Sequence, residues 1–289
     1  MNNNWLTIEQ EGQRVILKKC VKEAEGEIII PEGVTDIAQG AFGGCHNVSN
    51  VIIPNSVETI GIGAFIYCGI SSIHIPTNVK EIAQAPAFED KFAPFPFYGN
   101  HYKSITVDPN NRYYDSRENC NAIIETATNR LITASSKTII PESVKIIGNG
   151  AFFCTGHKKI DIPNGIEAIE SFAFYYCKQL PMVIIPPSVT FIGDCAFDEY
   201  HTKIIKKDSS MSIVDYIIYR GLPEFNEDWP AFFRDLFTVF PEWRDQLKSA
   251  RNSSLLLHKL GGVASYTLFY HELEEYLKEK GLPQFSNIN

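Results

Sequence analysis

Cysteine is the residue type in this chain whose spacing first invites a chemical interpretation, because seven are present. Cys45 precedes Cys68 by 23 residues, and the same interval separates Cys154 from Cys177. Zinc or redox sites typically place two thiols much closer, as Cys-x-x-Cys, and no such pair occurs. The spacing is typical of a repeated buried turn, where a small polar side chain meets free backbone groups. We interpret these four cysteines as a structural ladder, with Asn100 in the same position of an interrupted repeat.

Other residues that could do chemistry lack the partners that it would need. His271-Glu272 has no second histidine at the zinc-protease spacing, and the chain has no nucleophile elbow, phosphate loop or dinucleotide fingerprint. Asp108, Asn110 and Asp115 lack the glycine and the terminal glutamate of a calcium loop and are typical of turns. We therefore predict no catalytic residue, no metal and no cofactor, and a protein that is not an enzyme.

Charge and hydropathy narrow the classes of partner. Lys and Arg number 26 against 34 acidic residues, a formal net charge of −8. This balance argues against nucleic acid and against an anionic membrane surface, both of which select basic faces. No apolar run is long enough for a transmembrane segment. Residues 1–10 show neither the basic nor the apolar region of a signal peptide, so we expect a cytoplasmic protein, or a cell-surface or secreted one if a leader has been removed.

One phrase recurs along the chain: Ile-Pro, then Val or Ile, Ile, Ala-Phe and usually Cys. In its first occurrence, Ile30-Pro31 is followed by Val34, Ile37, Ala41-Phe42 and Cys45. Successive prolines are separated by 22 or 23 residues within each run, and they are Pro31, Pro54 and Pro76, then Pro141, Pro163 and Pro186. A period held this closely predicts one solenoid coil per repeat, in the leucine-rich range.

Each position in the phrase has a physical role. The alternation before each proline, as in Val51-x-Ile53, indicates a short strand with one buried face. Strands of successive coils stack in parallel, and proline ends them where a missing N–H costs little. The Ala-Phe pairs fill the interior on the convex side. The predicted fold is a right-handed leucine-rich-repeat solenoid with one parallel β-strand per coil, mostly β with an irregular convex side, followed by an all-α module.

These phrases resemble the BspA-like leucine-rich repeats, a bacterial subclass common in surface proteins and present in some protists. The resemblance covers residues 26–207. It is supported by Val107-Asp108-Pro109-Asn110-Asn111 with the following Tyr114-Asp115-Ser116, which is similar to a hairpin often inserted between repeats of this family. Ile123-Ile124 and Leu131-Ile132 would be the strands of that hairpin. The resemblance implies a role in adhesion or host interaction.

The domain organisation follows from where the period holds. Residues 1–29 are predicted to form a hairpin cap, and residues 30–207 the solenoid, with an aromatic loop and hairpin inserted at about 84–138. Residues 208–289 carry helical signals over 211–220, 226–240, 241–260 and 263–280, the last with a clear apolar stripe. We interpret this helical part as a cap on the last coil, with an independent binding domain as the alternative.

The outward strand residues form the first candidate binding surface, on the concave face. A curved sheet of mixed side chains suits a protein or peptide better than a small metabolite. A shift of one residue would turn these side chains inward. The predicted partner-binding residues are Asn50, Ile52, Ser72, His74, Ser104, Thr106, Lys159, Asp161, Met182 and Ile184.

An aromatic insertion between Pro86 and Ile105 is the second candidate. Phe97 is expected to be the buried Ala-Phe phenylalanine of the interrupted coil, and the other rings exceed what one coil can hide. They are either a rigid projection that anchors a partner or a local satellite core folded over the solenoid edge. The partner-binding residues predicted here are Phe92, Phe95, Tyr98 and Tyr102.

The leading functional prediction is a non-catalytic leucine-rich-repeat protein that binds a protein partner through its concave face. Two alternatives stay open. One is a glycan-binding surface protein that uses the aromatic insertion. The other is a helical effector module that the repeats target to its place of action.

Overall fold

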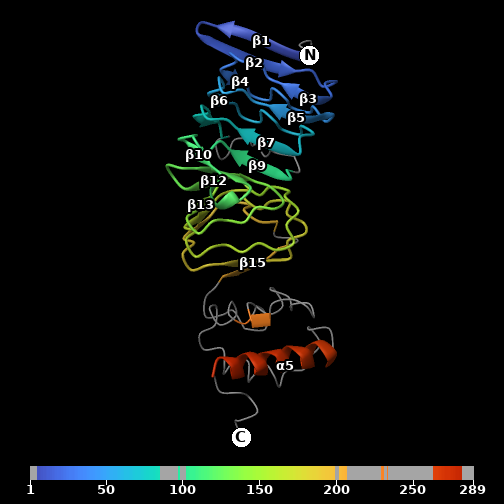
Figure 1. The fold of residues 1–289 in the computed structure, drawn as a ribbon, viewed down its shortest axis with the longest axis vertical. Helices are drawn as coiled ribbons and strands as arrows, with labels where there is room; N and C mark the ends of the chain where they lie inside the picture. Colours follow the sequence, from blue (N-terminus) through green and yellow to red (C-terminus); the bar gives the residue numbers. More distant parts are fainter. Residues whose placement is uncertain are drawn as a thin grey trace. The chain divides into compact units, whose positions relative to one another are not determined.

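A computed structural model describes residues 5–84, 97, 102–198, 202–206, 229–230, 233 and 263–281. The chain divides into two compact units, residues 1–205 and 206–289. The first unit is a stack of parallel coils and contains nearly all of the strands described below (Figure 1).

The coils of the first unit form two arrays, and each array begins with an antiparallel hairpin. The first hairpin is β1 (Leu6–Glu11) and β2 (Arg14–Cys20). The short strands β4 (Asp36–Ile37), β6 (Thr59–Ile60) and β8 (Glu81–Ile82) then add to β2 in parallel, one per coil. Arg14 on β2 donates two hydrogen bonds to the Asp36 carboxylate on β4, at 3.0 and 2.5 Å, which fixes the hairpin to the first coil.

The second array repeats this arrangement. Strand β10 (Tyr114–Asp115) and the 3₁₀ turn η2 (Arg117–Asn119) lead into a hairpin of β11 (Ala122–Glu125) and β12 (Arg130–Ala134). Strands β13 (Ile146–Ile147), β14 (Ala168–Ile169) and β16 (Phe191–Ile192) add to β12 in parallel. The hairpin expected at residues 123–124 and 131–132 is therefore present, and it starts a second array.

A second row of strands runs along the opposite side of the coils. It contains β3 (Gly26–Ile29) with β5 (Val48–Ile52), β7 (Ser72–Ile75) with β9 (Ser104–Val107), and β15 (Met182–Ile185) with β17 (Lys203–Lys206). Figure 1 shows β3, β5, β7 and β9 along one side of the unit and β4, β6 and β13 along the other. The coils that carry β3 and β4, β5 and β6, β7 and β8, and β15 and β16 thus contribute one strand to each row, with the core between the rows.

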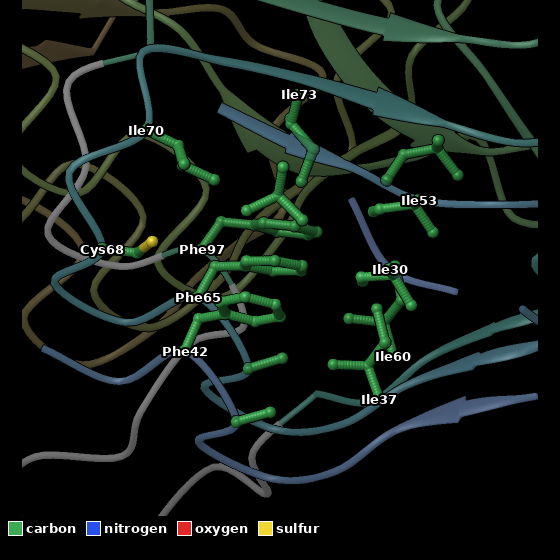
Figure 2. Close-up of a cluster of buried hydrophobic side chains, with 14 of the residues drawn as sticks. Ile30, Ile37, Phe42, Ile53, Ile60, Phe65, Cys68, Ile70, Ile73 and Phe97 are labelled. Carbon is green, nitrogen blue, oxygen red and sulfur yellow. The ribbon is translucent and has the colours of Figure 1, made fainter. Parts of the chain in front are cut away.

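The recurring phrase maps directly onto the interior of each coil. After each proline, the chain turns so that the N–H three residues later donates to the proline carbonyl, as Val57 does to Pro54 at 3.1 Å. The Ala-Phe phenylalanines stack from coil to coil, with 5.2 Å between the ring centroids of Phe42 and Phe65 and 5.8 Å between those of Phe65 and Phe97 (Figure 2). The prediction that Phe97 fills the interrupted coil is therefore confirmed, since the residue is buried.

The cysteine ladder is confirmed at three positions and wrong at the fourth. Cys45, Cys68 and Cys177 are buried, and each donates its N–H to the phenylalanine carbonyl three residues earlier. In the Phe152 coil this bond comes from Thr155, whose hydroxyl also donates to the Phe152 carbonyl at 3.0 Å. Cys154 lies one residue earlier, half-buried, with a left-handed φ of 60°. Asn100 lies outside the described residues.

The β11–β12 hairpin separates two hydrophobic cores. Ile123 and Ile132 lie in the core of the first array, whereas Ile124 and Leu131 lie in that of the second. Alternate strand residues point to opposite faces, so a two-stranded wall can serve both cores at once. The boundary between the arrays is therefore filled by side chains and not by solvent.

The second unit is described mainly by one helix, α5 (Val263–Glu279), which confirms the last predicted helix. Phe269, Tyr270, Leu273 and Leu277 on its apolar stripe are buried. Phe269 packs against Phe233, with 5.8 Å between the ring centroids. The other three predicted helices lie outside the described residues, apart from short helical pieces at 229–230 and 233.

Candidate binding surface

The predicted partner-binding residues of the strands all lie outside the core. We call them, with their neighbours in the same row, the exposed strand face. The residues between them are buried, which fixes the register: these are Val51, Ile73, Ile105, Ile160 and Val183. Their placement shows how the face is built, and their role in binding stays a prediction.

The N-terminal part of the exposed strand face combines a polar pair with an apolar pair. Asn50 lies opposite Glu27 across the β3–β5 ladder, and its Nδ2 donates to the Glu27 carboxylate at 2.9 Å. Ile29 and Ile52 form the next cross-strand pair, with 54% and 43% of their surfaces exposed. These two adjacent β-branched side chains form an exposed apolar pair at the N-terminal end of the strand row.

The central part is polar. His74 and Thr106 lie opposite each other on β7 and β9, and the His74 Nδ1 lies 3.0 Å from the Thr106 hydroxyl. Ser72 and Ser104 form the neighbouring pair. These short side chains offer hydrogen-bond donors and acceptors without bulk, so a partner can approach the backbone closely here.

The C-terminal part returns to apolar residues. Met182 and Ile184 are half-buried on β15, and Ile204 on β17 is 36% exposed. Lys159 and Asp161 belong to a coil that forms no regular strand, yet their alternation with the buried Ile160 is kept. Their charged groups lie 3.9 Å apart.

The predicted set misses three residues of the same face. Glu27 and Ile29 fall within the segment interpreted as a cap, although Ile28-Ile29-Ile30-Pro31 follows the strand pattern. Ile139 holds the same position, two residues before Pro141, and is 79% exposed. In every repeat, the residue two positions before the proline points outward. Applying this rule to Pro31 and Pro141 would have identified both isoleucines.

The aromatic insertion is corrected at Tyr102, which was predicted to contact a partner. Tyr102 is only 2% exposed and packs edge-on against Phe97, with 6.2 Å between the ring centroids. It belongs to the first core, because the coil that holds Phe97 needs a large side chain to complete it. Phe92, Phe95 and Tyr98 lie outside the described residues.

Within the described part of the chain, no group of three or more His, Cys, Asp or Glu side chains is placed to hold a metal ion. The helix described here is neither long nor apolar enough to cross a membrane. The exposed strand face is an array of outward side chains that recurs from coil to coil in the first unit.

Parallel coils of this period, with buried strand positions and a stacked interior, define a leucine-rich-repeat protein. A comparison with protein families matches residues 18–92 and 97–223 to the BspA type leucine rich repeat region, in six copies. The chain therefore belongs to this family.

A comparison with solved structures matches the chain to proteins from several bacteria. A leucine-rich repeat protein from Eubacterium ventriosum is 21% identical, with a TM-score of 0.46, and the match covers 62% of this chain and 53% of that one. A leucine rich cell surface protein from Faecalibacterium prausnitzii is 31% identical, with a TM-score of 0.41, and the match covers 61% of this chain and 39% of that one. The pneumococcal vaccine antigen PcpA is 17% identical, with a TM-score of 0.48, and the match covers 70% of this chain and 61% of that one.

The chain thus spans less than two thirds of the length of each of these proteins. A comparison with curated proteins gave no significant match.

Proposed function

We propose that this protein binds another protein, without catalysis, through the exposed strand face. The observation that carries the proposal is the exposure of Ile29, Ile52 and Ile139 at one repeated position, two residues before the proline of three coils. The cores of both arrays are filled by other residues, so these isoleucines add nothing to the interior. Apolar side chains left outside on a regular scaffold are typical of contact residues.

The mixed character of the face supports a protein as the partner. Apolar residues at its two ends flank the central Ser72, His74, Ser104 and Thr106, and opposite charges meet at Lys159 and Asp161. Non-obligate protein interfaces have this mixture, in which a few buried apolar anchors supply most of the affinity. The membership of the chain in a family of BspA type repeats is consistent with it.

The proposal is tested by capture from cells of the source and from their surroundings, with the full chain as bait. The variant Ile29→Glu/Ile52→Glu places two carboxylates on the face without entering the core. We expect it to lose the partner that the unchanged protein retains, because two charges would be desolvated in the contact. Circular dichroism establishes that the variant is folded.

The matched control is Phe191→Glu, which changes an apolar residue that is 55% exposed on the other strand row. This variant should keep the partner. Equal retention of the partner by Ile29→Glu/Ile52→Glu, or its loss with Phe191→Glu alone, would contradict the proposal.

A further inference from the structure

The turns on either side of the core phenylalanines hold the backbone in a conformation that favours glycine. Two residues before the phenylalanine, Gly40, Gly63 and Gly150 have φ values between 60° and 63°. In the Phe174 coil this place is taken by Phe172, with φ of 59°. A bulky side chain at such a φ is uncommon and strained.

The same coil has an aromatic residue with a left-handed φ at a second position. Two residues after the core phenylalanine, the first coil has Gly44, with φ of 77°. The Phe174 coil has Tyr176 there, with φ of 56°, and two other coils have Tyr67 and Cys154 at this position, with φ of 49° and 60°. One coil thus carries aromatic side chains at two left-handed positions where glycine would be free of strain, at a cost of about 1 kcal/mol each.

These rings gather with two others outside the stacked interior. Tyr175 contacts Phe172 and Tyr176, with ring centroids 5.6 and 4.8 Å apart, and Phe153 on the preceding coil stacks on Tyr176 at 5.6 Å. We call Phe153, Phe172, Tyr175 and Tyr176 the aromatic turn patch. Tyr176 is 43% exposed and the other three are half-buried.

The patch is separate from the core of its array. The interior at this level is filled by Phe152, Phe174 and Phe197, whose ring centroids are 4.8 and 5.1 Å apart. In the first array, Gly43 and Ile66 hold the position that Phe153 and Tyr175 occupy, and Gly40 and Gly63 hold that of Phe172. Filling the interior therefore does not require rings at these three places.

Positive charge accompanies the rings in this acidic protein. The Lys178 ammonium lies 5.2 Å from the centroid of the Tyr176 ring, and Lys178 is exposed. Flat aromatic faces pack against the C–H faces of sugar rings, while ammonium groups bind carboxylates. We propose that the aromatic turn patch is a binding site for an acidic polysaccharide that contains uronic acid.

A polymer fits this geometry better than a free sugar. The rings of Phe153, Tyr175 and Tyr176 lie on the turns of two successive coils and contact one another, so the patch extends beyond a single coil. Each contact is weak, and their sum along one chain supplies the affinity. This site is independent of the exposed strand face, so either proposal can fail without the other.

The test measures binding of the full chain to polygalacturonate, with neutral dextran as the comparison, by affinity electrophoresis. Unchanged protein should be retarded by polygalacturonate and not by dextran, and the retardation should weaken as salt is added. Tyr176→Gly should lower the affinity about tenfold, and Lys178→Gln should lower it several-fold.

Tyr67→Gly is the matched control, because Tyr67 has the same left-handed backbone in a coil of the first array, with φ of 49°. The two glycine variants should have similar melting temperatures, while only Tyr176→Gly loses binding. Equal binding of dextran and polygalacturonate, unchanged binding by Tyr176→Gly, or an equal loss with Tyr67→Gly would each overturn the proposal.

Discussion

Ile123 and Ile124 are neighbours in the chain, yet their side chains lie in different hydrophobic cores. Both are fully buried. The β11–β12 hairpin that carries them is the start of the second array and also the cover of the first. Each array therefore has its own core and shares one wall.

The shared wall predicts that truncation of these two residues has separable effects. Ile123→Ala and Ile124→Ala should each lower the free energy of unfolding by about 2–4 kcal/mol, because each leaves a cavity in a packed core. Ile123→Ala should reduce amide protection mainly in β4, β6 and β8, and Ile124→Ala mainly in β13, β14 and β16. Hydrogen exchange read by mass spectrometry distinguishes them, and identical protection maps would argue against two cores.

Asn111 is predicted to be a large single contributor to stability among the polar residues. Its Nδ2 donates to the carbonyls of Pro76 and Val79, at 2.7 and 3.0 Å, and its Oδ1 accepts the N–H groups of Tyr113 and Tyr114. Asn111→Ala removes all four of these hydrogen bonds and should cost about 2–4 kcal/mol in urea unfolding. The exposed neighbour Asn110 provides the control, and Asn110→Ala should cost far less.

Acid should destabilise the second array through His157. Burial lowers the pKa of His157 from its ordinary value of 6.5, so the folded protein keeps the imidazole neutral. The unfolded chain takes up a proton below about pH 6.5, so stability is complete above that pH and is lost as the pH falls below it. Thermal unfolding should show a weaker pH dependence between pH 5 and 7 in His157→Gln than in the unchanged protein.

The control for this prediction is His46→Gln, since His46 is exposed. That variant should follow the pH dependence of the unchanged protein. A His157→Gln variant that loses stability on acidification as steeply as the unchanged protein would remove His157 from the explanation.

The cysteines should differ sharply in their reaction with thiol reagents. Burial raises the pKa of Cys68 to about 12 and that of Cys177 to about 11, so neither is a thiolate near neutral pH. Cys195 is exposed and should react first with a disulfide reagent at pH 8, with Cys154 next. Mass spectrometry after timed quenching identifies the order, and early modification of Cys177 in folded protein would contradict it.

Much of the fold was predictable because the same pattern of apolar residues occurs in every repeat, and a pattern that is weak in one repeat becomes clear when it recurs. The Ile-Pro and Ala-Phe phrases identified the buried strand positions and even Phe97, whose coil is interrupted. Ladder assignment failed at Cys154 because that coil places its cysteine two residues after Phe152, while the others place it three residues after. The turn needs a small polar side chain, and Thr155 meets that need as well as cysteine does.

The candidate surfaces were less predictable, for a physical reason. Strand alternation separates outward from inward residues, and it placed Ile52 and His74 correctly outside. It could not show that Tyr102 is needed to complete the core beside Phe97, since that contact depends on how an irregular segment folds back. Nor could it show the strain at Phe172 and Tyr176, because φ is a property of the turn and not of the residue type.

A stack of parallel coils is open-ended by nature, because the last strand of each row offers unpaired amides to any strand of matching pitch. At β8, the Tyr114 hydroxyl accepts a hydrogen bond from the Ile82 N–H at 2.9 Å and so pairs one of these amides. A side chain thus satisfies a backbone amide that no following strand of that row pairs. An edge whose amide is already hydrogen-bonded offers one site fewer to a strand of another molecule, so this phenol group lowers the tendency of the first array to pair with other chains.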